Sequence, residues 1–277
     1  MSNNNNYEMT IKAGQTERHY WLDLLRYREL FYFLAWRDIS VRYKQTVIGI
    51  AWSVIRPVLI MIILTIVFGK LAKLPSNGIP YPILVFSALL PWQFFANAFT
   101  DAGNSLIGNA NMISKIYFPR LIIPTSAIIV SLLDFAIAFL ILLGLMFWYE
   151  FYPDWRMFTL PLFIMYAFIT VFGSSLWIAA LNVKYRDFRY IIPFIVQFGL
   201  YISPVGFSSN VVPGQWRLLY SINPMVGVIE GFRWAILGDT SAIYWPGFML
   251  SICLVTILLV TGIIYFRKTE RSFADVI

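Results

Sequence analysis

Six long apolar stretches constrain this chain more than any other feature of its sequence. They cover residues 47–68, 81–100, 121–149, 157–183, 190–207 and 242–266. An α-helix needs roughly 17 or more apolar residues to cross about 30 Å of hydrocarbon, and each stretch is that long. Membrane-spanning strands would instead give alternating segments of about 10 residues, which the sequence lacks. The sequence therefore predicts an all-α integral membrane protein with six transmembrane helices.

The composition agrees with a bilayer as the solvent of this protein. Charged residues make up 13% of the chain and hydrophobic residues 59%, with a mean hydropathy of +0.70. Soluble domains contain about 25% charged residues, so a typical soluble globular protein and a disordered chain are both excluded. The chain has a single cysteine, Cys253, and a single histidine, His19. An intramolecular disulfide and a Cys/His zinc site within one chain are therefore excluded as well.

The basic residues predict the orientation of the spans. Most of the 21 Lys and Arg residues lie in the N-terminal segment, in the loops after the second and fourth stretches, or in the C-terminal tail. The positive-inside rule then places both termini in the cytoplasm. The chain begins with a polar run that does not resemble a signal peptide. We expect one domain, 1–277, made of a cytoplasmic arm and interface helix (1–46), a six-span bundle (47–267) and a cytoplasmic tail (268–277).

A surface helix is predicted over residues 20–45, ahead of the first span. Tyr32, Trp36, Ile39 and Tyr43 recur at spacings of four, three and four, so they form one stripe on a helix. Such a stripe is typical of an amphipathic helix that lies in the membrane interface. From residue types alone, this helix is either a membrane anchor or a lever that a cytoplasmic partner moves.

Two charged residues lie inside the predicted spans. Arg56, which precedes Pro57, is in the first span, and Asp134 is in the third. Intramembrane charges usually face the interior of a bundle or an aqueous path, although an arginine near an interface can also reach the headgroups. We therefore regard Arg56 and Asp134 as candidates for a polar path through the membrane.

Two further features of the apolar sequence allow more than one interpretation. Between the fifth and sixth spans, the apolar run 218–229 is too short to cross and is interrupted by Asn223-Pro224. It predicts re-entrant helices, or else a packed outer cap. The aromatic cluster Trp92, Phe94 and Phe95 offers faces along which a sugar chain can slide, or else packs within the bundle and its aromatic belts.

Sequence motifs for nucleotide binding and hydrolysis are absent. There is no G-x-x-x-x-G-K-[ST] phosphate loop, no H-E-x-x-H and no G-x-S-x-G. We expect no cofactor, metal or catalytic residue in this chain. Work against a gradient would then require another subunit or an ion gradient, and the spans hold few ionisable residues for a proton relay.

The motifs together resemble a known family. The run LAWRDISVRYKQTVIGIAWSVIRP, residues 34–57, resembles the N-terminal signature of type-2 ABC exporter permeases for polysaccharides, which include O-antigen, capsule and teichoic-acid exporters. Further matches are SKIYFPR (114–120), VKYRD (183–187), Asn223-Pro224 and RKTER (267–271). The resemblance covers nearly the whole chain, and the permease of a lipid-linked O-antigen exporter is the most similar type.

This resemblance implies an assembly and a cargo. Two permease chains would pair with two copies of a separate ATPase, which binds ATP and Mg²⁺, in the bacterial cytoplasmic (inner) membrane. The cargo would be a lipid-linked glycan that passes through a channel lined by spans one and five, and no nucleic acid is expected as a partner. The helix around residues 30–44 would be the gate or interface helix, and residues 112–117 would form the coupling helix.

The resemblance also assigns candidate residues. Those for ATPase coupling or the gate are Arg37, Asp38, Arg42, Lys115, Tyr117 and Asp187. Arg56 and Asp134 would be polar groups of the channel, and Trp92, Phe94 and Phe95 would contact the glycan. Two alternatives are an ABC permease for a drug or small lipid, and a membrane-embedded enzyme that modifies a lipid-linked sugar.

Overall fold

The computed structural model describes residues 20–44, 49–238 and 243–273, in which every regular element is a helix. The long helices are α3 (Gly49–Leu64), α4 (Tyr81–Gly108), α6 (Ile122–Trp148), α7 (Leu160–Lys184) and α11 (Trp245–Glu270). A π-helix, η1 (Thr65–Leu71), extends α3, and a 3-10 helix, η2 (Trp155–Thr159), precedes α7. The shorter helices are α1 (Tyr20–Arg26), α2 (Arg28–Lys44), α5 (Ala110–Ile113), α8 (Phe188–Ile202), η3 (Ser209–Val211), α9 (Gly214–Tyr220) and α10 (Pro224–Leu237).

The predicted all-α class is confirmed for these residues. The predicted first residues of spans one and six, Val47 and Ala242, lie outside the described residues, as do residues 1–19 of the predicted arm, Gln45 and Thr46, and residues 274–277 of the predicted tail.

The number of helices that are long and apolar enough to span a membrane is five in the described part of the chain, not six. They are Ala51–Leu71, Tyr81–Gly108, Ile122–Trp148, Trp155–Lys184 and Trp245–Glu270. The predicted fifth span, 190–207, instead forms α8, which has 15 residues and ends at Ile202. At 1.5 Å per residue α8 is about 22 Å long, less than the roughly 30 Å of a hydrocarbon core. The helix ends because Ser203 is extended and precedes Pro204, which disfavours helical backbone at the residue before it.

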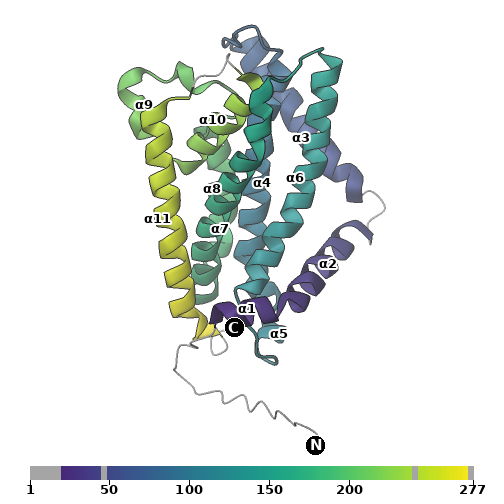
Figure 1. The fold of residues 1–277 in the computed structure, drawn as a ribbon, viewed down its shortest axis with the longest axis vertical. Coiled ribbons are helices and arrows are strands. Elements are labelled where there is room, and N and C mark those ends of the chain that lie inside the picture. The colour runs from purple at the N-terminus through teal and green to yellow at the C-terminus, as the bar shows by residue number, and fades with distance from the viewer. Residues whose placement is uncertain (1–19, 45–48, 239–242, 274–277) are drawn as a thin grey trace, which may run out of the picture.

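The segment that contains α8 nevertheless connects the two ends of the bundle, as the long helices α4, α6, α7 and α11 do (Figure 1). α1 lies at the same end as the last turn of α11, where the Tyr20 hydroxyl donates a hydrogen bond of 3.0 Å to the Glu270 carboxylate. The backbone N–H of Arg120, just before α6, donates to the same carboxylate at 2.8 Å. α8 begins at this end and α11 begins at the opposite one, so the segment that contains α8 makes the fifth pass.

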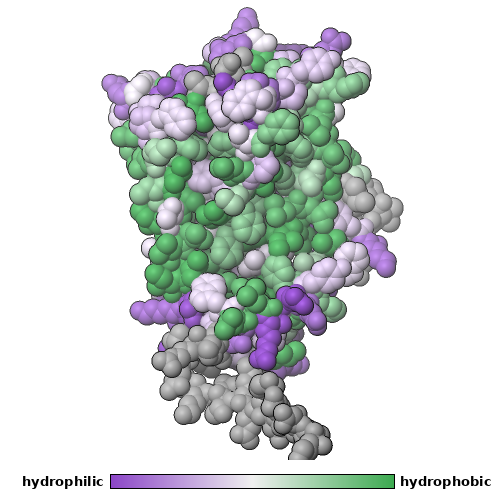
Figure 2. Space-filling model, viewed as in Figure 1, coloured by the Kyte–Doolittle hydropathy of each residue, from purple (hydrophilic) through white to green (hydrophobic). Residues whose placement is uncertain are grey.

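The outer surface of the bundle matches a membrane environment. Figure 2 shows a hydrophobic band around the middle of the molecule, with hydrophilic residues gathered at the two ends. Large apolar side chains on this surface are exposed, among them Phe147 (85%) and Phe158 (89%). Burying such surface in lipid removes it from water, which is why exposed apolar groups are stable here.

α4 forms the centre of the bundle and packs against α3, α6, α7, α8 and α10. Its side chains from Ile83 to Phe99 are buried, with the exceptions of Gln93 and Asn97. α7 and α11 approach each other closely at two glycines. A Cβ at Gly173 would lie 2.8 Å from backbone atoms of Leu259, and a Cβ at Gly262 would lie 2.5 Å from the Gly173 carbonyl oxygen. Small residues at such a seam allow two membrane helices to pack backbone to backbone.

Two short helices, α9 and α10, occupy the position predicted for re-entrant helices. The Asn223 side chain caps α10 by accepting a hydrogen bond of 3.0 Å from the Met225 N–H. Arg233 of α10 is buried and donates to the carbonyl oxygens of Phe207 (2.7 Å), Val205 (3.1 Å) and Leu84 (3.2 Å). These hydrogen bonds join α10 to α4 and to the end of the α8 connection, at the end of the bundle opposite α1.

The predicted surface helix is present as two helices, α1 and α2, which are separated at Tyr27. The predicted stripe is divided between two environments. Tyr32 and Trp36 are exposed and stack on each other, with ring centroids 6.4 Å apart, whereas Tyr43 turns toward the bundle and contacts Asp134. The stripe is divided because α2 is inclined and packs against α6 (Figure 1).

Candidate transport cavity and its polar network

A cavity of about 750 Å³ lies between α3, α4, α6 and α8. Its wall combines apolar side chains such as Ile60 and Leu200 with polar ones. In a protein with five membrane-spanning helices, a cavity of this size with polar lining is the default candidate for a binding or transport site.

The polar lining follows one face of α4. Gln93, Asn97, Thr100 and Asp101 are spaced by four, three and one residues, which places them on one side of a helix. All four line the cavity, and they are partly exposed in a helix that is otherwise buried at this level. The Thr100 hydroxyl donates back to the Ala96 carbonyl oxygen at 2.7 Å. This stripe gives a membrane-spanning helix a hydrophilic side.

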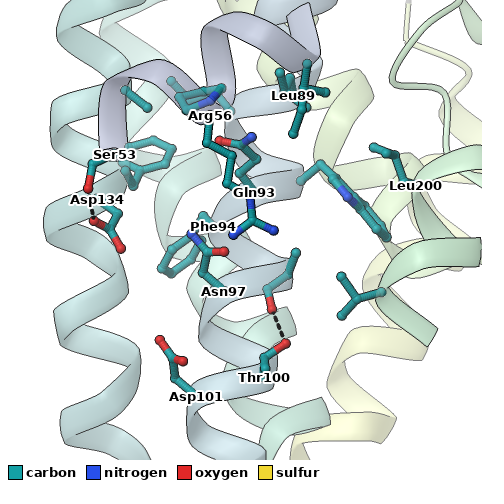
Figure 3. Close-up of a pocket in the computed structure, with 18 of the residues that line it drawn as sticks. Ser53, Arg56, Leu89, Gln93, Phe94, Asn97, Thr100, Asp101, Asp134 and Leu200 are labelled. Atoms are coloured by element: carbon teal, nitrogen blue, oxygen red, sulfur yellow. Dashed lines mark hydrogen bonds between the residues drawn. The ribbon is translucent and has the colours of Figure 1, made fainter. Parts of the chain in front are cut away.

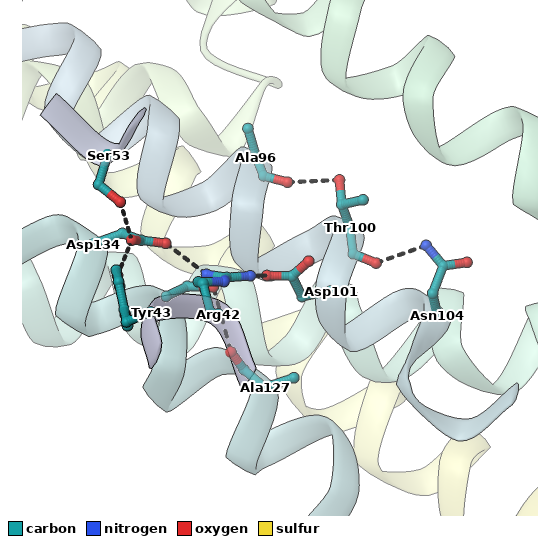
Figure 4. A network of polar contacts seen from close by, with 10 residues as sticks. Arg42, Tyr43, Ser53, Ala96, Thr100, Asp101, Asn104, Ala127 and Asp134 are labelled. Atoms are coloured by element: carbon teal, nitrogen blue, oxygen red, sulfur yellow. Dashed lines mark hydrogen bonds and ion pairs between the residues drawn. The ribbon is translucent and has the colours of Figure 1, made fainter. Parts of the chain in front are cut away.

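A charged network at one side of the cavity joins four helices (Figure 4). Arg42 of α2 binds Asp134 of α6 at 2.6 Å and Asp101 of α4 at 2.5 Å. Asp134 also accepts hydrogen bonds from the Tyr43 hydroxyl of α2 and from the Ser53 hydroxyl of α3, the latter at 3.1 Å. One guanidinium shared by two carboxylates needs these extra donors, because partly buried carboxylate oxygens are costly to leave unpaired.

The same network changes the acidity of Tyr43. Burial raises the pKa of Tyr43 to about 12, and the hydrogen bond to Asp134 and the negative charge of that carboxylate add to the effect. The neutral phenol is favoured because a phenolate would lie against a carboxylate. Tyr43 therefore acts as a stable hydrogen-bond donor at neutral pH.

The two predicted intramembrane charges line this cavity together, but they have different surroundings. Asp134 is bound to Arg42, Tyr43 and Ser53 and does not pair with Arg56. Arg56 is exposed, and its side chain extends from α3 beside Gln93 and Asn97 (Figure 3). Both residues were predicted to lie on a polar path, and both are found in the cavity wall. Their role in transport stays a prediction.

The predicted aromatic residues divide between the cavity and the core. Trp92 and Phe94 line the cavity, whereas Phe95 does not and stacks on Phe99 with ring centroids 5.3 Å apart. Trp92 is 4% exposed, and its indole occupies the space of a missing side chain at Gly199 of α8, where a Cβ would lie 2.5 Å from the ring. Contact between these rings and a glycan remains a prediction.

Several predicted coupling residues lie at the end of the bundle that holds α1 and α5. Arg37 of α2 binds its neighbour Asp38 at 2.7 Å and donates a hydrogen bond of 2.9 Å to the Asn109 side chain, between α4 and α5. Arg42, predicted for the same role, lies farther along α2 in the cavity network, and its role stays a prediction. Asp187 is exposed and immediately precedes α8.

The predicted coupling helix at 112–117 is wrong in its extent. The helix in this loop is α5, which covers Ala110–Ile113, and Lys115 and Tyr117 lie in the turn that follows it. Ile113, the last residue of α5, is buried, whereas Ile116 in the turn is 59% exposed.

The functional residues that the sequence prediction missed are on α4. Asp101 was expected to begin a loop, but α4 continues to Gly108 and carries Asp101 into the network. The sequence did indicate a longer helix, because polar residues recur at helical spacing from Gln93 to Asn104. This pattern was overlooked because the charge at Asp101 ends the apolar run. In the part of the chain that the structure describes, no three His, Cys, Asp or Glu side chains gather as metal ligands.

A helical bundle with several membrane-length helices and a polar-lined cavity among them defines a multi-pass membrane protein. Residues 29–237 match the ABC-2 type transporter family, and the chain belongs to this family of membrane permeases.

Characterised relatives cover most of the chain. The O-antigen export system permease protein RfbA of Klebsiella pneumoniae is 27% identical over 249 residues, which are 87% of this chain and 92% of the relative. RfbA of Myxococcus xanthus is 24% identical over 214 residues, 76% of this chain and 81% of the relative. The polysialic acid transport protein KpsM of Escherichia coli is 24% identical over 242 residues, 85% of this chain and 92% of the relative.

Proposed function

We propose that this chain is the permease of an ATP-driven exporter that carries a lipid-linked polysaccharide of the O-antigen class across the bacterial inner membrane. The observation that carries the proposal is the cavity between α3, α4, α6 and α8 with its polar stripe on α4. A sugar chain cannot cross hydrocarbon without hydrogen-bond partners, and the stripe supplies them at membrane depth. The functions of the relatives, O-antigen export and polysialic acid transport, support a polysaccharide as the cargo.

The proposed assembly contains two permease chains and two copies of a separate ATPase subunit. The ATPase would bind ATP and Mg²⁺ and would contact the end of the bundle that carries Arg37, Asp38, Lys115, Tyr117 and Asp187. Closure of the ATPase pair would push on α2 and on the α5 turn. The Arg37–Asn109 hydrogen bond and the Arg42 network would carry that movement to α4 and α6 as a rigid-body shift.

Export in a bacterial strain that lacks its own permease tests the proposal. The chain is expressed with its ATPase partner in a strain that makes the lipid-linked glycan, and glycan at the cell surface is measured. We expect surface glycan with both proteins and none when the phosphate-loop lysine of the ATPase is replaced. Export by the permease without an ATPase, or transport of a drug in place of the glycan, would contradict the proposal.

The coupling role of α2 has a matched test. Arg37→Ala and Asn109→Ala each remove the hydrogen bond between α2 and the end of α4, and we expect each to lower glycan-stimulated ATPase activity several-fold. Arg28→Ala, an exposed change on the same helix, is the control. Normal stimulation and normal export in the Arg37 variant would remove this contact from the mechanism.

A further inference from the structure

Arg56 is the cation of the cavity wall that makes no hydrogen bond or ion pair with any described residue. Its guanidinium lies in the cavity, where Gln93 and Asn97 of α4 are its labelled neighbours in Figure 3. An arginine side chain stays charged in a protein and presents five N–H donors. A charged group with free donors in a membrane-spanning segment is a ligand-binding candidate, because lipid tails offer it no acceptor.

The other charges of the cavity do not neutralise Arg56. The described charged residues that line it are Arg42, Asp101 and Asp134, together with Arg56. Both carboxylates are already shared with Arg42, and Asp134 also accepts from Tyr43 and Ser53. The formal charges of the four residues sum to zero. Arg42 bridges the two carboxylates, however, and the guanidinium of Arg56 is separate from this group.

Three side-chain amides line the same cavity as this guanidinium. Gln93, Asn97 and Gln197 all line the cavity, and none makes a side-chain hydrogen bond to another described residue. Gln93 and Asn97 are the partly exposed positions of a buried stretch of α4, so they face the cavity and not the lipid. The site therefore offers one guanidinium fork and additional neutral N–H donors.

The position of Arg56 along its helix suggests the kind of anion. The apolar segment of the first span begins at Ala51, so Arg56 lies about 8 Å along the helix axis from its start. This places Arg56 in the first third of the span, on the side that adjoins α2. A guanidinium fork matches phosphate oxygens in a bidentate arrangement.

We propose that Arg56, Gln93 and Asn97 form a subsite for the phosphate group of a lipid-linked cargo. The inference rests on the proposed function and adds which part of the cargo is held and where. The apolar tail would stay in the bilayer beside the cavity, and the polar chain would lie along the α4 stripe. A phospholipid of the bilayer carries the same chemistry, and the experiment separates the two sources.

Binding of undecaprenyl diphosphate to the complete complex tests the subsite. The permease–ATPase complex is placed in phosphatidylcholine nanodiscs and titrated with labelled undecaprenyl diphosphate, and with undecaprenol as the probe that lacks phosphate. We expect Arg56→Gln to weaken diphosphate binding about tenfold or more, Arg56→Lys to weaken it less, and Asn97→Leu to weaken it a few-fold. Lys70→Gln removes an exposed cation at the far end of the same span and is the matched control. Undecaprenol binding should be equal in every variant.

Each outcome decides the proposal. Unchanged diphosphate binding in an assembled Arg56→Gln complex would overturn it. If that variant does not assemble, Asn97→Leu and Arg56→Lys decide, and wild-type affinity in both would overturn it. Equal displacement of the probe by phosphatidylglycerol would assign the site to bilayer phospholipid and also overturn it.

Diphosphate binding through Arg56 without polysaccharide export by the wild type would refute the proposed function alone, whereas normal binding and export in Arg56→Gln would refute the subsite alone.

Discussion

Asp134 is one of the residues through which α2 is attached to the membrane bundle. It accepts from Arg42 and Tyr43 of α2 and from Ser53 of α3, while Arg42 bridges to Asp101. Removing one member leaves a partly buried charge without its partner. The energetic coupling of this network is therefore concentrated in a few side chains that lie far apart in sequence.

A double-mutant cycle on Arg42 and Asp134 measures that coupling. We expect Arg42→Gln and Asp134→Asn each to lower the free energy of unfolding by about 2 kcal/mol, because each leaves charged or polar groups unpaired. The double variant should be less destabilised than the sum, by about 1 kcal/mol or more. Denaturant unfolding in detergent gives these values, with Arg28→Gln as an exposed control, and simple additivity of the two changes would contradict the network.

Tyr43 makes the stability of the network depend on pH at the alkaline end. Its pKa is raised to about 12 by burial and by Asp134, above the ordinary tyrosine value near 10. A raised pKa means that the contribution of Tyr43 is fully present below about pH 10 and is lost as pH rises from about 10 to 12. We expect the stability advantage of wild type over Tyr43→Phe to vanish across that range. An advantage that persists at pH 12 would show that Tyr43 does not donate to Asp134.

Arg56 and Asp134 could be predicted as special from the sequence, because a charge within an apolar run is conspicuous. Their partners could not be predicted. Which residue pairs with Asp134 depends on how α2, α4 and α6 meet in space, and Arg42 lies 92 residues away along the chain. Asp101 was missed for a local reason: hydropathy fell at this residue, although the helix continued.

At the scale of elements, the seam between α7 and α11 depends on two glycines. A side chain at Gly173 would meet the backbone of Leu259, and one at Gly262 would meet the backbone of Gly173. We expect Gly262→Ala and Gly173→Ala each to cost about 1–3 kcal/mol, because a backbone atom cannot move aside as a side chain can. Gly144→Ala on α6 meets open space and is the control, expected to be neutral or slightly stabilising. Thermal unfolding in nanodiscs compares the three variants, and equal effects would contradict close packing at this seam.

The ends of elements were predicted less well than their existence. Residues 203–207 carry enough apolar character to extend the predicted fifth span, but Pro204 and the extended backbone of Ser203 end α8 earlier. At α5, the helix predicted for residues 112–117 ends at Ile113, and a turn follows it. In both places backbone geometry, which hydropathy does not report, set the boundary.

For the whole molecule, six passes place the first and last described helices at one end of the bundle. With Cys253 replaced by Ser, single cysteines report on each side of the membrane. We expect Lys115→Cys and Lys268→Cys to react with a membrane-impermeant maleimide in inverted vesicles and not in intact spheroplasts, because both lie at the basic end. Lys70→Cys should show the opposite pattern. Labelling of Lys115→Cys and Lys268→Cys from different sides would disprove an even number of passes.

The length of α8 has a consequence for the surrounding lipid. Its roughly 22 Å faces an acyl region of about 30 Å, while the neighbouring helices are full length. Phe194 and Phe198 are exposed on one side of this helix, and its other side lines the cavity. Wherever this exposed side meets lipid, hydrophobic mismatch favours local thinning of the bilayer. The conformation of this protein would therefore respond to bilayer thickness. Lipids with longer acyl chains would strain α8 before any other helix.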